Sequence, residues 1–213
     1  MMVREVQTAA APEIDRREQV LAAAKTLFTT KGYETTTMAD VAKQASVSVG
    51  TLYHYFESKR DLLVHLAMEK GREIVQRLFS PEILALPPEE VARPMIEACF
   101  QACSDDPESV RLLQLYLDPA SETERWAQVD NQIVANLAPF LQVGMDQGIF
   151  NPMPAEMVAR LLVGMVDAAM HDCFVLENGA RQEEYKAGLV TVIERTLLRP
   201  ERLVERRRQS ATW

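Results

Sequence analysis

The sequence has 213 residues, of which 47% are hydrophobic and 25% charged, and its formal net charge is −8. These proportions exclude a wholly disordered chain, and the absence of an apolar run near roughly 18 residues excludes a membrane span. Residues 1–70 carry nine basic and nine acidic side chains, whereas residues 71–213 carry fourteen and twenty-two, so an anionic partner is expected at the N-terminal end. Three cysteines and no signal-peptide pattern predict a cytoplasmic protein.

Four helices are predicted after an aperiodic stretch over 1–13, which is expected to be a flexible arm. Hydrophobic residues recur at helical spacing over 16–32, and a glycine at the end provides a C-cap. A threonine and an aspartate three residues apart predict a capping box for a short helix over 37–45. A third helix over 48–56 and a fourth over 59–78 each have a serine cap. Two short helices joined by a tight turn, after a supporting helix, form a helix-turn-helix.

The remainder of the chain is punctuated by proline and glycine, with no alternation of the kind that predicts β-strands. Helices are expected over the segments 87–103, 107–117, 121–147 and 154–177, followed by a last helix near 185–197. The fold class is therefore predicted to be all-α.

The helix predicted over 48–56 has two chemically different sides. At about 100° per residue, Leu52 and Phe56 share an apolar side that can dock on neighbouring helices. Gly50, Thr51 and His54 lie on the opposite side, which is small and polar enough to enter a DNA major groove. Four residues are candidates to face bases: Val49, Gly50, Thr51 and His54.

Residues around this helix can supply phosphate contacts, which fix the register of a protein on DNA without reading its sequence. Two tyrosines flank the polar side, a threonine caps the preceding helix, and basic residues begin the first and fourth helices. The candidate phosphate contacts are Thr37, Tyr53, Tyr55, Lys59 and Arg17. Taken singly, these features also fit an ordinary surface helix with ordinary caps.

Short motifs in a fixed order strengthen the DNA-binding interpretation. In chain order they are Ala24-x-x-Leu27-Phe28, Lys31-Gly32-Tyr33, Thr36-Thr37-Met38-x-x-Val41-Ala42-x-x-Ala45 and Val47-Ser48-x-Gly50-Thr51-Leu52-Tyr53-x-Tyr55-Phe56-x-Ser58-Lys59-x-x-Leu62-Leu63. Over residues 16–66 they closely resemble the DNA-binding domain of TetR-family repressors. Ser46 stands where that family usually has glycine, which predicts an unusual backbone angle at this position.

The resemblance implies a helix-turn-helix domain over 14–60, an effector-binding and dimerisation domain over 61–200, and leaves a basic tail over 201–213. It implies a homodimer, in which the last two long helices of each protomer pair as a four-helix bundle. The partners would be a double-stranded, pseudo-palindromic DNA operator and a small apolar or amphipathic effector that releases the repressor. No cofactor is implied.

Methionine and aromatic residues in the body are candidates to line an effector pocket, although such residues at helical spacing most often form the core. The candidates are Phe100, Tyr116, Phe140, Met145, Met165, Met170, His171 and Phe174. Cys99 and Cys103 lie one helical turn apart and are more often core residues than a metal site or an oxidant sensor.

Two other classes of protein compete with this interpretation. A helical metal-carboxylate enzyme would need ligands such as a Glu-x-x-His motif, which the sequence lacks, so an enzyme is not expected. A non-specific architectural DNA binder would share the basic and polar contacts but would not discriminate between DNA sequences.

Overall fold

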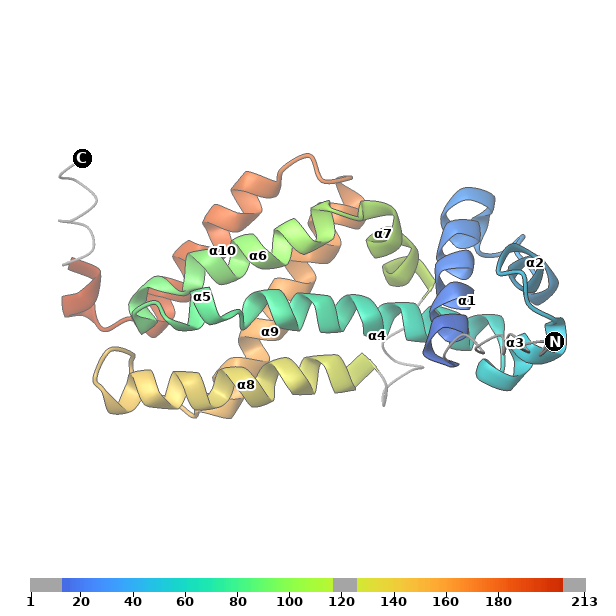
Figure 1. Ribbon diagram of the computed structural model, residues 1–213. Coiled ribbons are helices and arrows are strands. Elements are labelled where there is room, and N and C mark those ends of the chain that lie inside the picture. Colours follow the sequence, from blue (N-terminus) through green and yellow to red (C-terminus); the bar gives the residue numbers. More distant parts are fainter. Residues whose placement is uncertain (1–12, 117–125, 205–213) are drawn as a thin grey trace, which may run out of the picture. The chain divides into compact units, whose positions relative to one another are not determined.

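The structure is a computed structural model that describes residues 13–116 and 126–204, and these residues form helices and turns apart from one isolated β-bridge between Phe150 and Leu198 (Figure 1). The predicted all-α fold is thus confirmed. The chain divides into two compact units, Met1–Leu66 and Ala67–Trp213. The division falls after Leu66, whereas the sequence predicted a domain boundary after residue 60. The predicted arm and tail lie mostly outside the described residues.

The first unit contains the predicted succession of helices. Their bounds are α1 (Glu13–Leu27), the π-helical turn η1 (Phe28–Gly32), α2 (Met38–Gln44), α3 (Val49–Tyr55) and the start of α4 (Lys59–Leu78). α2 packs against both α1 and α3. The core residues of this unit are at most 2% exposed: Val20, Leu21, Ala24, Phe28, Val41, Ala42, Leu52, Phe56, Leu62 and Leu63.

Local backbone signals explain how these short helices begin and end. Gly32 ends η1 with φ +97°, a conformation that glycine adopts without a steric penalty. Thr37 and Asp40 form the predicted capping box at the start of α2. Ser46, in the turn between α2 and α3, has φ +56°. The expectation of an unusual backbone angle at Ser46 is therefore confirmed.

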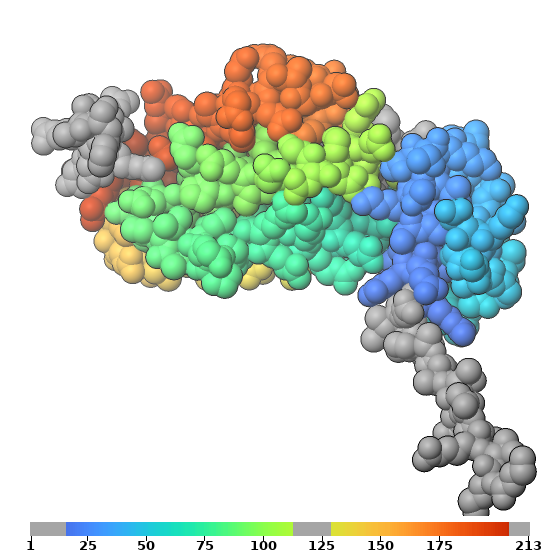
Figure 2. All heavy atoms as spheres, turned by 45° about the horizontal axis from the view of Figure 1, so that its top comes forward, coloured from blue at the N-terminus to red at the C-terminus, as the bar shows by residue number. Residues whose placement is uncertain are grey.

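The second unit consists of the rest of α4 and the helices that follow. Their bounds are α5 (Pro81–Leu84), the 3-10 helix η2 (Pro88–Glu90), α6 (Ala92–Ser104), α7 (Pro107–Tyr116), α8 (Trp126–Asp146), α9 (Ala155–His171), the π-helical turn η3 (Asp172–Leu176) and α10 (Gln182–Leu197). α8 packs along α9, and α10 packs along α6. Figure 2 shows a face of this unit on which α6 lies between α4 and α10.

Three details of the second unit differ from the predictions. The segment 87–103 is not one helix, because a 3-10 turn precedes α6. The helix predicted over 154–177 is α-helical only to His171 and then widens into η3, before Asn178 and Gly179 end it at positive φ. α5 was not predicted, although Ser80 caps it and Pro81 occupies its first turn.

Candidate functional site

α3 is anchored by the apolar side that the sequence predicted. Leu52 and Phe56 are completely buried. The ring of Phe56 contacts the ring of His65 with centroids 5.1 Å apart, and the guanidinium of Arg17 lies 5.4 Å from the Phe56 centroid. At the other end, Ser48 caps α3 by accepting a hydrogen bond from the Thr51 amide at 3.0 Å. A seven-residue helix gains its stability from such anchors, because isolated helices of this length are not stable in water.

The opposite side of α3 is open. Gly50 is exposed, and a Cβ added there would meet only Ser48 Oγ, at 3.8 Å. Val49 is 44% exposed, and His54 is exposed with its ring against that of Tyr55, at a centroid distance of 5.3 Å. Thr51 is half-buried, and its hydroxyl is hydrogen-bonded to Ser48 Oγ at 2.7 Å. Thus Val49, Gly50 and His54 are displayed, whereas the Thr51 hydroxyl is held by the helix cap.

The candidate phosphate contacts occupy different environments. Tyr53 is 52% exposed, and Tyr55 and Arg17 are half-buried. Thr37 is exposed, but its hydroxyl donates to Asp40 Oδ2 at 2.8 Å within the capping box. Lys31 donates to the same carboxylate at 2.7 Å, which is the largest cause of a strongly lowered Asp40 pKa.

Lys59 has a structural role that the sequence did not indicate. Its ammonium donates to the carbonyl oxygens of Tyr33 at 2.7 Å and Glu34 at 3.1 Å, and it lies 4.4 Å from the Tyr33 ring centroid. These contacts tie the start of α4 to the loop between η1 and α2. Two of the three ammonium hydrogens are therefore already used in the absence of DNA.

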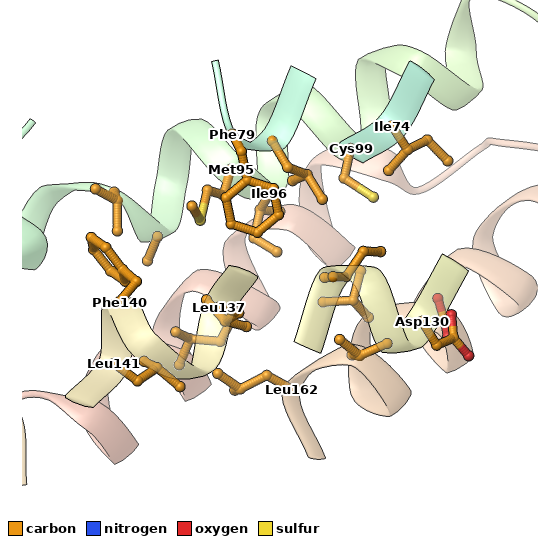
Figure 3. Close-up of a pocket in the computed structure, with 18 of the residues that line it drawn as sticks. Ile74, Phe79, Met95, Ile96, Cys99, Asp130, Leu137, Phe140, Leu141 and Leu162 are labelled. Atoms are coloured by element: carbon orange, nitrogen blue, oxygen red, sulfur yellow. The ribbon is translucent and has the colours of Figure 1, made fainter. Parts of the chain in front are cut away.

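The second unit encloses an apolar cavity of about 170 Å³ between α4, α6, α8, α9 and α10 (Figure 3). Among the candidate effector-pocket residues, only Phe140 and Met170 line it. Most of the wall comes from aliphatic residues that the sequence did not single out, including Ile74, Ile96 and Leu137. A cavity wall and a core share the same composition, so hydrophobicity alone did not separate the two.

Five of the other candidates do not line this cavity, and their role in effector binding stays a prediction. Phe100, Met145 and Phe174 are buried in the hydrophobic core and are not among the residues that line the cavity. Met165 is partly buried against that core, and His171 is exposed at the end of α9. Tyr116 ends α7, and its side chain lies outside the described residues.

Five ionisable side chains and two thiols also line the cavity: Lys70, Glu89, Asp130, Asp167, Glu194, Cys99 and Cys103. Desolvation by burial is the main cause of raised pKa values for both thiols, which reaches about 12 for Cys103. Thiols with raised pKa values carry little thiolate and react slowly with oxidants. The sequence reading missed Asp130 and Asp167, although an aspartate within an apolar helical segment is the signal that could have indicated them.

α9 and α10 carry an exposed apolar stripe. On α9, Met157 is 54% and Leu161 67% exposed, and a Cβ added at Gly164 would have no neighbour within 4 Å. On α10, Val192 is 49% exposed, and the surroundings of Gly188 are equally open. Large exposed apolar side chains beside small residues are typical of a surface that packs against another helix.

The parts of the chain that the structure describes contain no candidate metal site and no candidate membrane span. No three or more His, Cys, Asp or Glu side chains come together there as metal ligands. None of the helices in residues 13–116 and 126–204 combines the length and apolarity needed to cross a membrane.

The fold and the exposed side of α3 define a helix-turn-helix DNA-binding protein. Residues 20–66 match the family described as bacterial regulatory proteins, tetR family. The uncharacterized HTH-type transcriptional regulator YfiR of Bacillus subtilis is 26% identical, over 84% of this chain and 87% of its own. The HTH-type transcriptional repressor KstR2 of Mycolicibacterium smegmatis is 28% identical, over 69% of this chain and 74% of its own.

The fold is shared with solved structures. A TetR transcription regulator from Haloarcula marismortui superposes with a TM-score of 0.73 at 20% identity, covering 86% of this chain and 99% of its own. Residues 20–66 are therefore a DNA-binding domain of the TetR family. Members of this family bind DNA operators, are often repressors and are not enzymes.

Proposed function

We propose that this protein is a cytoplasmic, dimeric repressor that binds a pseudo-palindromic operator and leaves it when a small molecule occupies the cavity of the second unit. The observation that carries the DNA-binding part is the displayed side of α3, where Val49, Gly50 and His54 are exposed on a helix whose other side is fully buried. In this proposal these residues and the Thr51 methyl face bases, while Tyr53, Tyr55, Thr37, Arg17 and Lys59 contact phosphates.

The apolar stripe on α9 and α10 supports the dimeric part of the proposal. A second copy that buries Leu161 and Met157 would remove a large apolar surface from water, and small residues at Gly164 and Gly188 would allow close approach. A two-fold dimer would place two copies of α3 on half-sites about 34–36 Å apart, or a multiple of that spacing.

The cavity supports the ligand-responsive part. α4 begins at Lys59, which anchors it within the first unit, and its second half contributes Lys70 and Gly71 to the cavity wall. A Cβ added at Gly71 would lie 2.6 Å from Val129 Cγ2, so α4 and α8 pack without spare room. In the proposed mechanism, an effector favours a position of α4 in which the two α3 helices no longer match the operator. Its effect is limited by its differential affinity for the two states.

Selection of fragmented genomic DNA on the purified protein tests the DNA-binding part. A recovered fragment and an unrelated duplex of equal length are compared by fluorescence anisotropy at one salt concentration. A repressor is expected to bind the recovered site roughly 10³-fold or more tightly than the unrelated duplex. Equal affinities that fall together with added salt would instead identify an architectural DNA binder.

The substitution Gly71→Ala tests the proposed lever, with Arg72→Ala at an exposed neighbouring position of α4 as the control. Gly71→Ala is expected to change the operator affinity of the ligand-free protein or the ligand concentration that releases it, because α4 must move away from Val129. The proposed coupling through α4 would be abandoned if both quantities matched those of the control.

A further inference from the structure

The cavity of the second unit has two chemically different ends. In Figure 3, Asp130 lies at one end, whereas Phe140, Phe79 and Met95 lie towards the other. Asp167 from α9 also lines the cavity, and the charge of Asp130 helps to raise the pKa of Asp167. The two carboxylates come from different helices that pack along each other.

Neither carboxylate has a hydrogen-bond or ion-pair partner among the residues that the structure describes. The basic side chain among the described residues of the wall is that of Lys70, which is only 10% exposed. Its ammonium is already held by Glu73 Oε2 at 2.9 Å and by the carbonyl oxygen of Ala102 at 2.5 Å. The Cys99 thiol in the same wall is 6% exposed and likewise has no hydrogen-bond partner within the described part of the chain.

Unpaired carboxylates beside an apolar cavity are costly, because burial disfavours their charged form. Burial raises the pKa of Asp130, and burial together with the charge of Asp130 raises the pKa of Asp167 to about 7. Asp167 is nevertheless exposed to solvent, so a ligand can reach it. The attraction of a cation placed there would offset both the desolvation of the carboxylates and their mutual repulsion.

We propose that the cavity binds an amphipathic organic monocation, with its ammonium on the carboxylates of Asp167 and Asp130 and its apolar body among the aliphatic and aromatic side chains. This inference rests on the proposed role of the cavity as an effector site and names the chemical class of the effector. The described wall has four acidic side chains and one basic side chain, and this balance disfavours an anionic ligand.

The size of the cavity limits the apolar body. A volume of about 170 Å³ is close to that of an engineered apolar cavity of about 150 Å³ that holds benzene. A single ring with a short aminoalkyl chain is therefore a body of suitable size for the cavity. A dication held by protein ligands alone is disfavoured, because the two carboxylates have no third ligand among the described residues.

Three probes of nearly equal shape test the proposal by isothermal titration calorimetry on the full-length protein without DNA: 2-phenylethylamine, 2-phenylethanol and phenylacetate. The amine is expected to bind about tenfold or more tightly than the alcohol, and phenylacetate most weakly. In Asp167→Asn and Asp130→Asn this preference should shrink towards one, while the affinity of the alcohol stays unchanged. Asp146→Asn, at an exposed position on α8 outside the cavity wall, is the matched control and should retain the full preference.

The proposal is overturned if the alcohol or phenylacetate binds the unmodified protein as tightly as the amine, if no probe binds, or if the preference persists in both aspartate variants. An unchanged affinity for the alcohol in those variants would show that the cavity remains folded. Operator affinity with each probe is measured separately. If the amine binds selectively but leaves operator affinity unchanged, the proposed release mechanism fails while the assignment of the ligand class stands.

Discussion

The two units of this protein differ in how completely their polar side chains are paired and their apolar side chains are buried. In the first unit, the side chains that terminate and join the short helices find local partners, as in the capping box of Thr37 with Asp40 and the contacts of Lys59 with two carbonyl oxygens. In the second unit, Asp130 and Asp167 stand without partners among the described residues, and Leu161 remains 67% exposed. In the proposed function, the unpaired carboxylates of the second unit would contact a ligand, and its exposed apolar residues would contact a second copy.

Removing the anchor of α3 should have the largest effect. Phe56→Ala is expected to lower the free energy of unfolding by about 3–5 kcal/mol, because Phe56 is completely buried. The first unit should lose its structure and its DNA binding, which differential scanning calorimetry and anisotropy measure. Tyr53→Ala changes an aromatic residue of the same helix that is 52% exposed, and it should leave stability within about 0.5 kcal/mol. Equal losses of stability in the two variants would contradict the assignment of Phe56 to the buried side of α3.

The next largest effect is expected from a substitution in the exposed apolar stripe on α9 and α10. Leu161→Asp should prevent dimerisation by placing a charge where a second copy would bury an apolar side chain, and operator affinity should fall by roughly 100-fold or more. Sedimentation velocity measures the oligomeric state. Val143→Asp, at a position on α8 that is 50% exposed, introduces the same charge outside the stripe. A monomeric unmodified protein, or a dimer that survives Leu161→Asp, would refute this interface.

Substitution of Lys59 tests whether this residue stabilises the first unit, contacts DNA, or does both. Lys59→Ala should destabilise the first unit by about 1–3 kcal/mol, because the charged hydrogen bonds to Tyr33 and Glu34 are lost. If the remaining ammonium hydrogen also serves a phosphate, the slope of log affinity against log salt should fall by about 1 per protomer. Lys43→Ala, at an exposed lysine in the last turn of α2, is the control for nonspecific charge effects. A stability loss without a change of slope would make Lys59 purely structural.

The carboxylates of the second unit predict a pH dependence of stability. The pKa of Asp167 is raised to about 7 in the folded protein, above the unfolded value of about 3.9. The folded state therefore binds an extra proton between these values, and the contribution of Asp167 is fully present below about pH 4 and lost as the pH rises through about 7. Because solvent reaches this side chain and screens its charge, we expect Asp167 to contribute about 1 kcal/mol to the free energy of unfolding.

Thermal unfolding of Asp167→Asn measures this contribution. Near pH 8 the variant should melt about 2–4 °C higher than the unmodified protein, whereas near pH 5 the two should be nearly equal. Asp146→Asn should show no such pH-dependent difference, because Asp146 lies outside the cavity wall. An Asp167→Asn variant that is less stable at pH 8 would mean that the carboxylate is favourably paired in solution.

The sequence predicted the first unit more completely than the second for a physical reason. The ends of α2 and α3 depend on contacts within three or four residues, such as Ser48 with Thr51, and these contacts leave a readable pattern. The wall of the cavity depends on which face of each long helix meets which neighbour, and the sequence of one helix does not contain that information. Phe140 and Phe100 are similar in sequence context, yet one lines the cavity and the other is buried in the core.

Two non-glycine residues in the described part of the chain have positive φ, one in each unit, and they allow the smallest expected effects to be compared. Ser46→Gly should stabilise the first unit by about 0.5–1 kcal/mol, because φ +56° is strained for serine and not for glycine. Asn178→Gly in the second unit should stabilise less or destabilise, since asparagine tolerates φ +54° and its Oδ1 accepts a hydrogen bond from Arg111 at 3.0 Å. Chemical denaturation of both variants measures the difference. Equal gains would show that the Arg111 contact adds no stability and that backbone conformation alone decides both positions.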